Sequence, residues 1–387
     1  MTFRFRSARM SRKYLPPIVA LSLLLVVAAA WWLVRSPSAA GRSAGTAANT
    51  GPGHPAAVDV SRQVAARLDE ALVRLGASKD PGANRLMLAD LRRIFNSLPP
   101  EMVSREVQSF LASARDAATR LEITVESGGG LGDASSLRVF LLDYLGRIDR
   151  PAAGAVAAQI LAQYTTPDEW AVSLRNFAWA NPGAGSEAFL QAKARQLLGN
   201  PAWVREPSTG FLEAFDTIVY ARGTALLPEL AAFVRDRENQ AAAHAAYLTL
   251  DRLTIAEPTR MLPQLVDQPD LMKGREQSRA SLLARADLRE PAQRAAVEKY
   301  LLDPARDAGE LATFAGLYPN ANYMVSNNLL TAVDTPKSGQ LAAHDRAALA
   351  VVDQWLADPR FERLQPLLAR IHERLATFVR QAANGTP

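Results

Sequence analysis

The residue types that carry out most metal and thiol chemistry are sparse in this sequence. The 387 residues contain four histidines and no cysteine, which excludes disulfides, thiolate zinc sites, iron–sulfur clusters and cysteine nucleophiles. No His-Glu-x-x-His sequence or comparable metal-ligand spacing occurs. We therefore expect neither a metal ion nor a cofactor. The histidines lie far apart, at His54, His244, His344 and His372.

Motifs that activate a serine or bind a phosphate are also missing. The sequence contains no Ser-x-x-Lys and no Walker loop, and its Gly-x-Ser-x-Gly match at residues 41–45 lies in a stretch of small residues rather than between a strand and a helix, so serine hydrolysis and nucleotide binding are not indicated. An enzyme with acidic residues in a helical groove stays open as an alternative. Such an enzyme would require clustered carboxylates with raised pKa values. The leading prediction is a non-enzymatic protein.

Residues suited to recognition gather in one stretch, YPNANYMVSNN. Asparagine-rich turns commonly cap helices, which is the alternative explanation of this stretch. Because loops carry many recognition surfaces, we predict an exposed polar surface here that contacts a protein or peptide partner. The candidate contact residues are Tyr318, Asn320, Asn322, Tyr323, Asn327 and Asn328.

A second group of aromatic residues lies in one expected helix. Trp170 and Phe177 are seven positions apart and share a helical face, whereas Trp179 lies on another. This spacing favours a core between packed helices. A ligand-binding aromatic groove is the alternative.

The positive charge of the chain is concentrated at its N-terminus. The formal net charge is +5, and residues 1–57 contain seven of the 44 basic side chains and no acidic one. Residues 58–387 therefore have 37 basic and 39 acidic side chains. A nearly neutral domain has no long-range field that attracts phosphate backbones, so we expect no nucleic-acid partner.

One segment is apolar enough to cross a bilayer. Residues 18–34 are uncharged and would span about 26 Å as a helix, close to the thickness of the hydrocarbon layer. We predict a transmembrane helix over 15–35. Indoles favour the membrane interface, and the expected interface residues are Trp31, Trp32 and Arg35.

The basic residues before this helix predict its orientation. Segment 1–14 should stay in the cytoplasm, with the bulk of the chain exported. Because the Ala-, Arg- and Pro-rich composition is typical of bacteria, we expect a single-pass protein of the inner membrane with a periplasmic domain. A cleaved signal peptide ending near Ser38-Ala39-Ala40 is the alternative. Residues 36–57, rich in small residues, Gly and Pro, predict a flexible linker.

Helical periodicity repeats from about residue 58 onward and predicts an all-α fold. Breakers between the apolar stripes, such as Thr166-Pro167 and Glu290-Pro291, predict helix boundaries. The clearest stripes are Val64, Leu68, Leu72 and Leu75; Leu137, Phe140, Leu141, Tyr144, Leu145 and Ile148; and Leu367, Ile371, Leu375, Phe378 and Val379.

One stretch, LEITVE at residues 121–126, looks like a strand and precedes Gly128-Gly129-Gly130. A lone strand cannot build a sheet, so we interpret it as an extended loop or a frayed helix. The glycines would separate an N-terminal helical segment at 58–127 from a larger helical domain at 131–387.

An approximate repeat occurs within that larger domain. Leu227-Pro-Glu-Leu230 returns 35 residues later as Leu262-Pro-Gln-Leu265. Each copy should open one helix, and an Ala- and Leu-rich helix follows. Over residues 133–317 the pattern resembles HEAT-like or tetratricopeptide-like repeats, although the tetratricopeptide signature is absent. The resemblance implies an α-solenoid-like domain, and a compact helical bundle is the alternative.

The layout of anchor, linker and helical domain also resembles the lipase-specific foldases. Their signature, Arg-x-x-Phe-Asp-Tyr followed by Ser-Ala-x-Gly-Glu, is matched in part at residues 215–223. The matching positions are Phe215, Asp216, Ala221 and Gly223, and the departures are Leu212, Thr217 and Thr224. This resemblance implies a membrane-tethered periplasmic chaperone or secretion helper, which we keep as the alternative to a scaffold that binds a standing partner.

Overall fold

The computed structural model of the protein describes residues 55–323, 326–332 and 336–384, which belong to one compact unit, Gly53–Pro387. Within these ranges, no helix combines the length and the apolar character that a membrane span requires. Some predictions lie outside the described residues, namely the transmembrane helix at 15–35, its interface residues Trp31, Trp32 and Arg35, and residues 36–54 of the linker.

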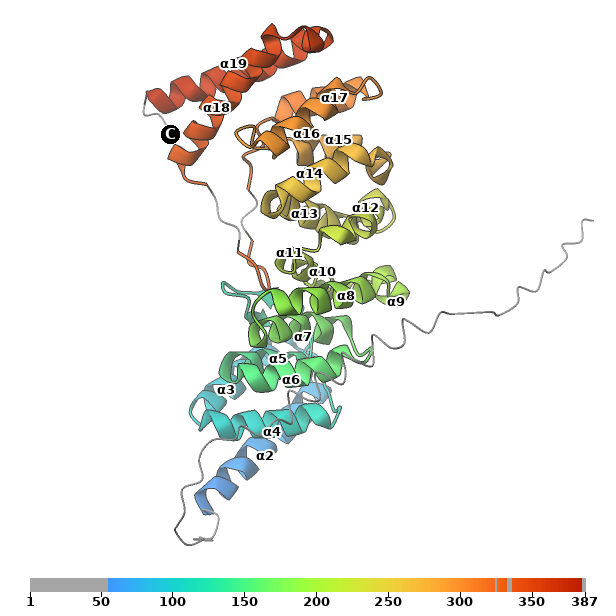
Figure 1. The fold of residues 1–387 in the computed structure, drawn as a ribbon. Coiled ribbons are helices and arrows are strands. Elements are labelled where there is room, and N and C mark those ends of the chain that lie inside the picture. The colour runs from blue at the N-terminus through green and yellow to red at the C-terminus, as the bar shows by residue number, and fades with distance from the viewer. Residues whose placement is uncertain (1–54, 324–325, 333–335, 385–387) are drawn as a thin grey trace, which may run out of the picture. The chain divides into compact units, whose positions relative to one another are not determined.

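The described residues are predominantly helical, which confirms the all-α character expected from the sequence (Figure 1). The α-helices are α2 (Pro55–Ala77), α3 (Pro81–Asn96), α4 (Pro100–Ala112), α5 (Leu137–Ile148), α6 (Arg150–Leu161), α7 (Pro167–Ala180), α8 (Glu187–Leu198), α9 (Pro201–Arg205), α10 (Thr209–Glu213), α11 (Asp216–Tyr220), α12 (Leu227–Arg235), α13 (Gln240–Ala256), α14 (Pro258–Asp267), α15 (Glu276–Leu283), α16 (Pro291–Leu302), α17 (Ala308–Leu317), α18 (Ser338–Ala357) and α19 (Gln365–Ala383). Short 3-10 helices lie at Ala184–Ser186, Thr224–Leu226, Pro269–Met272 and Pro359–Leu364.

Capping residues and prolines account for many of the helix starts. The Thr166 hydroxyl accepts a hydrogen bond from the Glu169 N–H at 3.1 Å, and Pro167 is the first residue of α7. Proline is favoured there because the first helical N–H has no intrahelical acceptor. The boundaries predicted at Thr166-Pro167 and Glu290-Pro291 are therefore confirmed.

The apolar stripes lie mainly in the core, with one exception. Val64, Leu68 and Leu75 are buried in α2, and the stripe of α5 is buried over most of its length. In α19, Ile371 and Leu375 are buried but Phe378 is 38% exposed. Phe378 belongs to the last two turns of the helix.

The middle helices pack in two rows that follow chain order. In the first row, α5 packs on α7, α7 on α10, α10 and α11 on α13, α13 on α15, and α15 on α17. The second row covers the first: α6 packs on α5 and α7, α8 on α7 and α11, α12 on α13, and α14 on α13 and α15. Figure 1 shows these helices succeeding one another from green to orange. Successive segments of the chain therefore build one continuous core.

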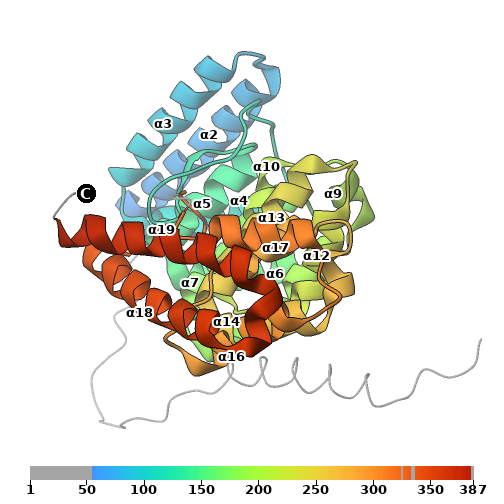
Figure 2. The ribbon, with the colours of Figure 1, turned by 90° about the horizontal axis from the view of Figure 1, so that it is seen from above.

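The last two helices close this arrangement at one end. Helix α18 packs on α19, and α19 packs on α17; Figure 2 shows α19 lying across α17. The Trp355 indole N–H donates to the Glu298 carboxylate at 2.9 Å, which joins α18 to α16.

The two Leu-Pro-x-Leu copies begin their helices differently. Leu227 is the first residue of α12, as predicted. The second copy does not open a helix, because α14 begins at Pro258 and Pro263 lies inside it. Leu262 and Leu265 are nevertheless fully buried, as are Leu227 and Leu230, so the apolar positions rather than the prolines correspond.

The stretch predicted as an extended loop or frayed helix is part of a small β-hairpin. Strand β1 (Thr124–Val125) pairs antiparallel with β2 (Leu131–Asp133). Gly128 and Gly129 make the turn with φ values of 84° and 82°, a region that residues with a side chain rarely adopt. The residues that follow the glycine turn thus supply the partner strand that the sequence interpretation lacked.

Three Asp–Arg pairs connect elements of the first row, and Arg285 of one pair lies two residues after the end of α15. Each joins residues 32 to 36 positions apart in the sequence, with N–O distances between 2.5 and 2.8 Å. Their side chains are buried or nearly so. The pairs are Asp143 with Arg175, Asp216 with Arg252, and Asp251 with Arg285.

Candidate functional site

The described parts of the segment that connects α17 to α18, residues 318–337, lie against several elements of the first row. Its described parts are 318–323, 326–332 and 336–337, and they contain no regular helix or strand. Figure 1 shows residues 326–332 beside the β1–β2 hairpin, well away from the end of α17. The contacts of this segment form two sites, which we call the Arg285 cleft and the Asp216 site.

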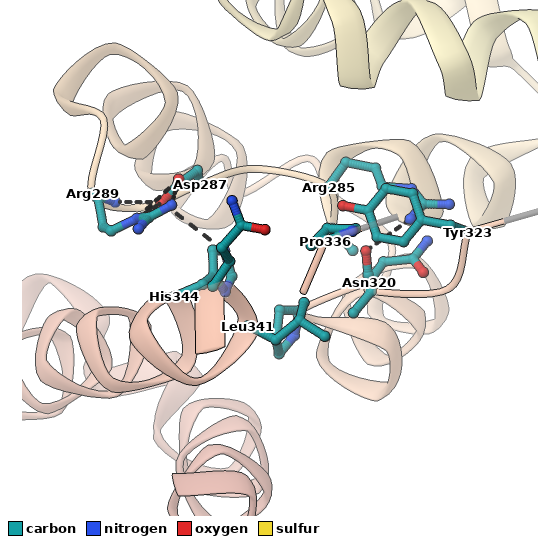
Figure 3. A pocket seen from close by; sticks show the side chains of 12 residues that line it. Arg285, Asp287, Arg289, Asn320, Tyr323, Pro336, Leu341 and His344 are labelled. Carbon is teal, nitrogen blue, oxygen red and sulfur yellow. Dashed lines mark hydrogen bonds and ion pairs between the residues drawn. The ribbon is translucent and has the colours of Figure 1, made fainter. Parts of the chain in front are cut away.

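In the Arg285 cleft, residues 318–323 are held mainly through their backbone. The Arg285 guanidinium donates to the carbonyl oxygens of Asn320 and Asn322 at 2.9 and 2.6 Å. The Asn320 N–H donates to the Ala284 carbonyl at 2.9 Å. The Tyr323 ring lies over the same guanidinium, with 5.2 Å from its centroid to Cζ (Figure 3). Backbone contacts of this kind place few demands on the side chains of the bound segment.

Asp251 orients this guanidinium and neutralises its charge. Its two carboxylate oxygens accept from Nε and Nη2 of Arg285 at 2.8 Å each. Such a bidentate arrangement fixes the plane of the guanidinium. The donors directed at the backbone carbonyls are therefore held in place before any polypeptide binds.

The Arg285 cleft contains a cavity of about 360 Å³, lined by residues of both the connecting segment and α18. Figure 3 shows Leu341 and His344 of α18 on one wall and Tyr323 on another. His344 Nε2 lies 4.0 Å from Asp287 Oδ1. Burial acts to raise the pKa of Asp287, but hydrogen bonds from Arg289 and the charge of His344 hold that pKa below its ordinary value.

The residues that line this cavity do not form a nucleophile site. Among the described lining residues there is no serine, threonine, cysteine or lysine that could attack a substrate. The pair of His344 and Asp287 therefore has no serine, threonine or cysteine beside it in this lining. The mixed polar and apolar walls suit binding.

The Asp216 site holds residues 328–331 through a carboxylate. Asp216 accepts from the N–H groups of Leu330 and Thr331 at 2.6 and 3.0 Å, and from the Thr331 hydroxyl at 2.6 Å. Arg252 Nη2 donates to the same carboxylate at 2.5 Å and also contacts the Thr331 hydroxyl. Arg252 Nη1 donates to Asn328 Oδ1 at 3.3 Å.

Gly129 of the hairpin turn lies directly against the connecting segment. A Cβ atom at this position would lie 2.1 Å from the Leu329 carbonyl oxygen, closer than nonbonded atoms approach. Leu329 is itself buried. The hairpin turn therefore forms part of the Asp216 site, and glycine is required for the backbones to meet.

The structure separates the six predicted contact residues. Asn320, Asn322 and Tyr323 lie at the Arg285 cleft, and Asn322 is exposed. Asn328 belongs to the Asp216 site, and Asn327 is exposed beside it.

Tyr318 differs from its prediction as an exposed contact residue. Its side chain is fully buried and stacks on Phe314 with 5.3 Å between ring centroids. Burial raises its pKa above the ordinary value. Tyr318 thus anchors the start of the connecting segment in the core.

The sequence interpretation missed the charged residues that hold the segment: Asp216, Asp251, Arg252 and Arg285. A signal for them exists. Asp216 and Asp251 are 35 residues apart, the same spacing as the Leu-Pro-x-Leu copies. Extending that period from leucines to charged residues would have linked Asp216 with Asp251, whereas Arg252 and Arg285 are 33 residues apart.

One feature matches the requirement of the acidic-groove alternative. Glu213 lies with Asp216 at a cavity of about 320 Å³. Burial, and then the charge of Asp216, raise the pKa of Glu213 above its ordinary value. Both oxygens of Asp216 already accept hydrogen bonds, so this carboxylate is a binding group and Glu213 is a single candidate acid without a second free carboxylate.

Within the described residues, no group of three or more His, Asp or Glu side chains is arranged to hold a metal ion. Trp170 is fully buried and Phe177 packs against the core, as the core interpretation of these aromatic residues requires.

No protein-family model, curated protein or solved structure matches the chain, so the function must be inferred from its own residues.

Proposed function

We propose that this chain is a non-enzymatic scaffold of the bacterial inner membrane whose exported helical rows bind an extended segment of a protein or peptide partner. The observation that carries the proposal is the Arg285 cleft, where a helical row binds an extended polypeptide through backbone carbonyls. The bound segment belongs to the chain itself. This contact supports the proposal, because the same guanidinium donors could meet the backbone carbonyls of a partner segment.

The cavity of the cleft supports binding of a further polypeptide. The space of about 360 Å³ lies between the connecting segment and α18. A volume of this size accommodates one or two large side chains and lies within the range of ligand pockets. The tyrosine and the arginines of the lining are residue types that are enriched in protein interfaces.

A helical-repeat architecture of the HEAT-like or tetratricopeptide-like kind is part of this proposal. The Asp–Arg pairs support it, because contacts at separations of 32 to 36 residues are expected when successive repeats stack.

Two buried Arg–Glu pairs add to this support. Arg138 pairs with Glu169, and Arg279 pairs with Glu310, each across 31 residues. Each arginine also donates to a backbone carbonyl, that of Leu111 in α4 for Arg138 and that of Pro269 in a 3-10 helix for Arg279. Each glutamate is the third residue of its helix and is preceded by a capping side chain, as expected if one structural unit recurs.

The proposal can be tested by selecting linear peptides from a displayed library against the full-length chain. We expect enriched peptides whose affinity falls at least tenfold, about 1.4 kcal/mol, for Tyr323→Ala. Tyr164→Ala is the matched control, because Tyr164 is an exposed tyrosine (65%) that stacks on Trp170, in a different part of the fold. Failure to enrich any peptide, or equal binding to Tyr323→Ala and wild type, would contradict the proposal.

A further inference from the structure

The Asp216 carboxylate is satisfied mainly by the connecting segment. It is 4% exposed, and three of its hydrogen bonds come from Leu330 and Thr331. The remaining partner is Arg252. A buried carboxylate that lost three donors would incur a large desolvation cost, so this site is built to be occupied by polypeptide.

The site selects a definite kind of polypeptide. Two successive backbone N–H groups must point at one carboxylate oxygen, which excludes proline from both positions. The second residue must also provide a hydroxyl group to the other oxygen. Arg252 adds a preference for a side-chain oxygen three residues earlier, where Asn328 lies.

The segment does not fill the space around it. A cavity of about 320 Å³ is lined on one side by Ser326, Asn327 and Asn328. A second cavity of about 370 Å³ is lined by Thr331 and Ala332. Both also contain Arg252 in their walls. Larger side chains could therefore be accommodated on either side of the bound backbone.

We propose that residues 326–332 are an internal ligand of a second peptide site, and that a partner segment that bends as Leu329 and Leu330 do, with an Asn-x-x-Thr or Asn-x-x-Ser pattern, replaces them there. The partner would carry large side chains flanking this pattern, filling the two cavities. Gly129 would accept its backbone as it accepts that of Leu329. This inference rests on the proposed function and specifies the chemistry of one partner class.

The test empties the site and supplies the segment in trans. In the full-length chain, residues 326–332 are replaced by seven Gly and Ser residues, and a labelled synthetic peptide with the sequence SNNLLTA is added. We expect the peptide to bind the replaced chain at least tenfold more tightly than wild type. Binding should be lost when the peptide carries valine in place of Thr331, or when the chain also carries Asp216→Asn.

A less disruptive variant covers the case in which the replaced chain does not fold. Thr331→Val in the intact chain removes the hydroxyl group that donates to Asp216 and contacts Arg252, so the added peptide should compete with the internal ligand better than in wild type. A replaced chain that folds, as judged by circular dichroism, but does not bind the peptide overturns the inference. Equal binding of the threonine and valine peptides overturns it too.

The outcomes separate this inference from the proposed function. If library peptides bind the Arg285 cleft but SNNLLTA does not bind the emptied chain, only the internal-ligand inference fails. If SNNLLTA binds through Asp216 while no library peptide depends on Tyr323, the binding function of the cleft fails instead.

Discussion

The Arg285 cleft and the Asp216 site hold two parts of one connecting segment through opposite groups. Arg285 donates to two backbone carbonyls, whereas Asp216 accepts from two successive backbone N–H groups. Both residues belong to Asp–Arg pairs of the same helical row. An Asp–Arg pair can therefore bind either the carbonyl groups or the N–H groups of a main chain, depending on whether the arginine or the aspartate faces the segment.

The physical basis is the surplus of hydrogen-bonding capacity in such a pair. A guanidinium has five N–H donors and a carboxylate about four acceptor positions, so a bidentate pair leaves both partly unused. Mutual neutralisation lets the pair remain buried. What remains is a set of oriented donors or acceptors, which an extended polypeptide can satisfy.

The third pair, Asp143 with Arg175, shows the limit of this behaviour. Asp143 accepts from the Leu131 N–H at 3.0 Å, and Arg175 donates to the Gly129 carbonyl at 2.7 Å. Both side chains are completely buried. This pair holds the β1–β2 hairpin from a completely buried position, whereas cavities adjoin the Asp251–Arg285 and Asp216–Arg252 pairs.

Removing the carboxylate of the buried pair should have the largest effect. Asp143→Ala leaves Arg175 buried without its counter-charge, and we expect the free energy of unfolding to fall by roughly 3–5 kcal/mol. Asp353→Ala is the control, because its carboxylate is 57% exposed beside His372, and it should change stability by less than about 0.5 kcal/mol. Urea denaturation measures both, and a loss below that of the control would show that the third pair is not structural.

Neutralising Asp216 should have a smaller and more local effect. In Asp216→Asn, the amide group cannot accept all the hydrogen bonds, and we expect about 1–3 kcal/mol of destabilisation. Hydrogen exchange should accelerate in residues 326–332. Asp251→Asn should leave exchange in that segment unchanged, because Asp251 orients Arg285 at the other site. Equal acceleration in both variants would remove the distinction between the two sites.

Two adjacent glycines isolate the contact between the hairpin and the segment. Gly128 and Gly129 have nearly the same positive φ, but only Gly129 would place a Cβ against Leu329. Both alanine substitutions therefore carry similar backbone strain. Gly129→Ala should cost about 1–2 kcal/mol more than Gly128→Ala, measured by thermal unfolding, and should alone speed exchange in residues 326–332.

The smallest effect is a difference in pH response between the two sites. Burial and Asp216 raise the pKa of Glu213, so the folded state favours its protonated form. Its stabilising contribution is present below the ordinary value of 4.5 and is lost as pH rises through the raised pKa. Glu213→Gln should flatten this fall in stability above pH 4.5.

Asp287 at the cleft should respond in the opposite direction. Burial is outweighed by Arg289 and His344, which lower its pKa. Its contribution is present above the ordinary value of 3.8 and is lost as pH falls through the lowered pKa. Asp287→Asn should therefore reduce the loss of folding stability as the pH falls. Denaturation curves of Glu213→Gln, Asp287→Asn and wild type between pH 2 and 8 provide the comparison. If both substitutions change the pH dependence of the free energy of unfolding in the same direction, the prediction is contradicted.

Much of the helical structure follows from the sequence alone. Periodic leucines and valines predict buried helix faces because side chains three and four positions apart share one side. The α2 and α5 stripes are buried for this reason. Proline and capping residues predict the boundary at Thr166-Pro167, since both act within one turn.

The connecting segment could not be placed in this way. Tyr318 and the asparagines carry no periodicity, so nothing local distinguishes a buried anchor from an exposed contact. Leu330 meets Asp216 across 114 positions, and Gly129 meets Leu329 across 200 positions. The hairpin was also misinterpreted, because its partner strand follows a glycine turn.

The sequence by itself determined which faces of the helices become buried, because hydrophobic periodicity acts over a few residues. It also marks residues 15–35 as apolar enough for a membrane helix, which stays a prediction. The tertiary structure alone specifies which Asp–Arg pairs have unused hydrogen-bond donors or acceptors and which chain segments these groups bind. Those contacts depend on the relative position of helices some 35 residues apart, and no local pattern encodes it.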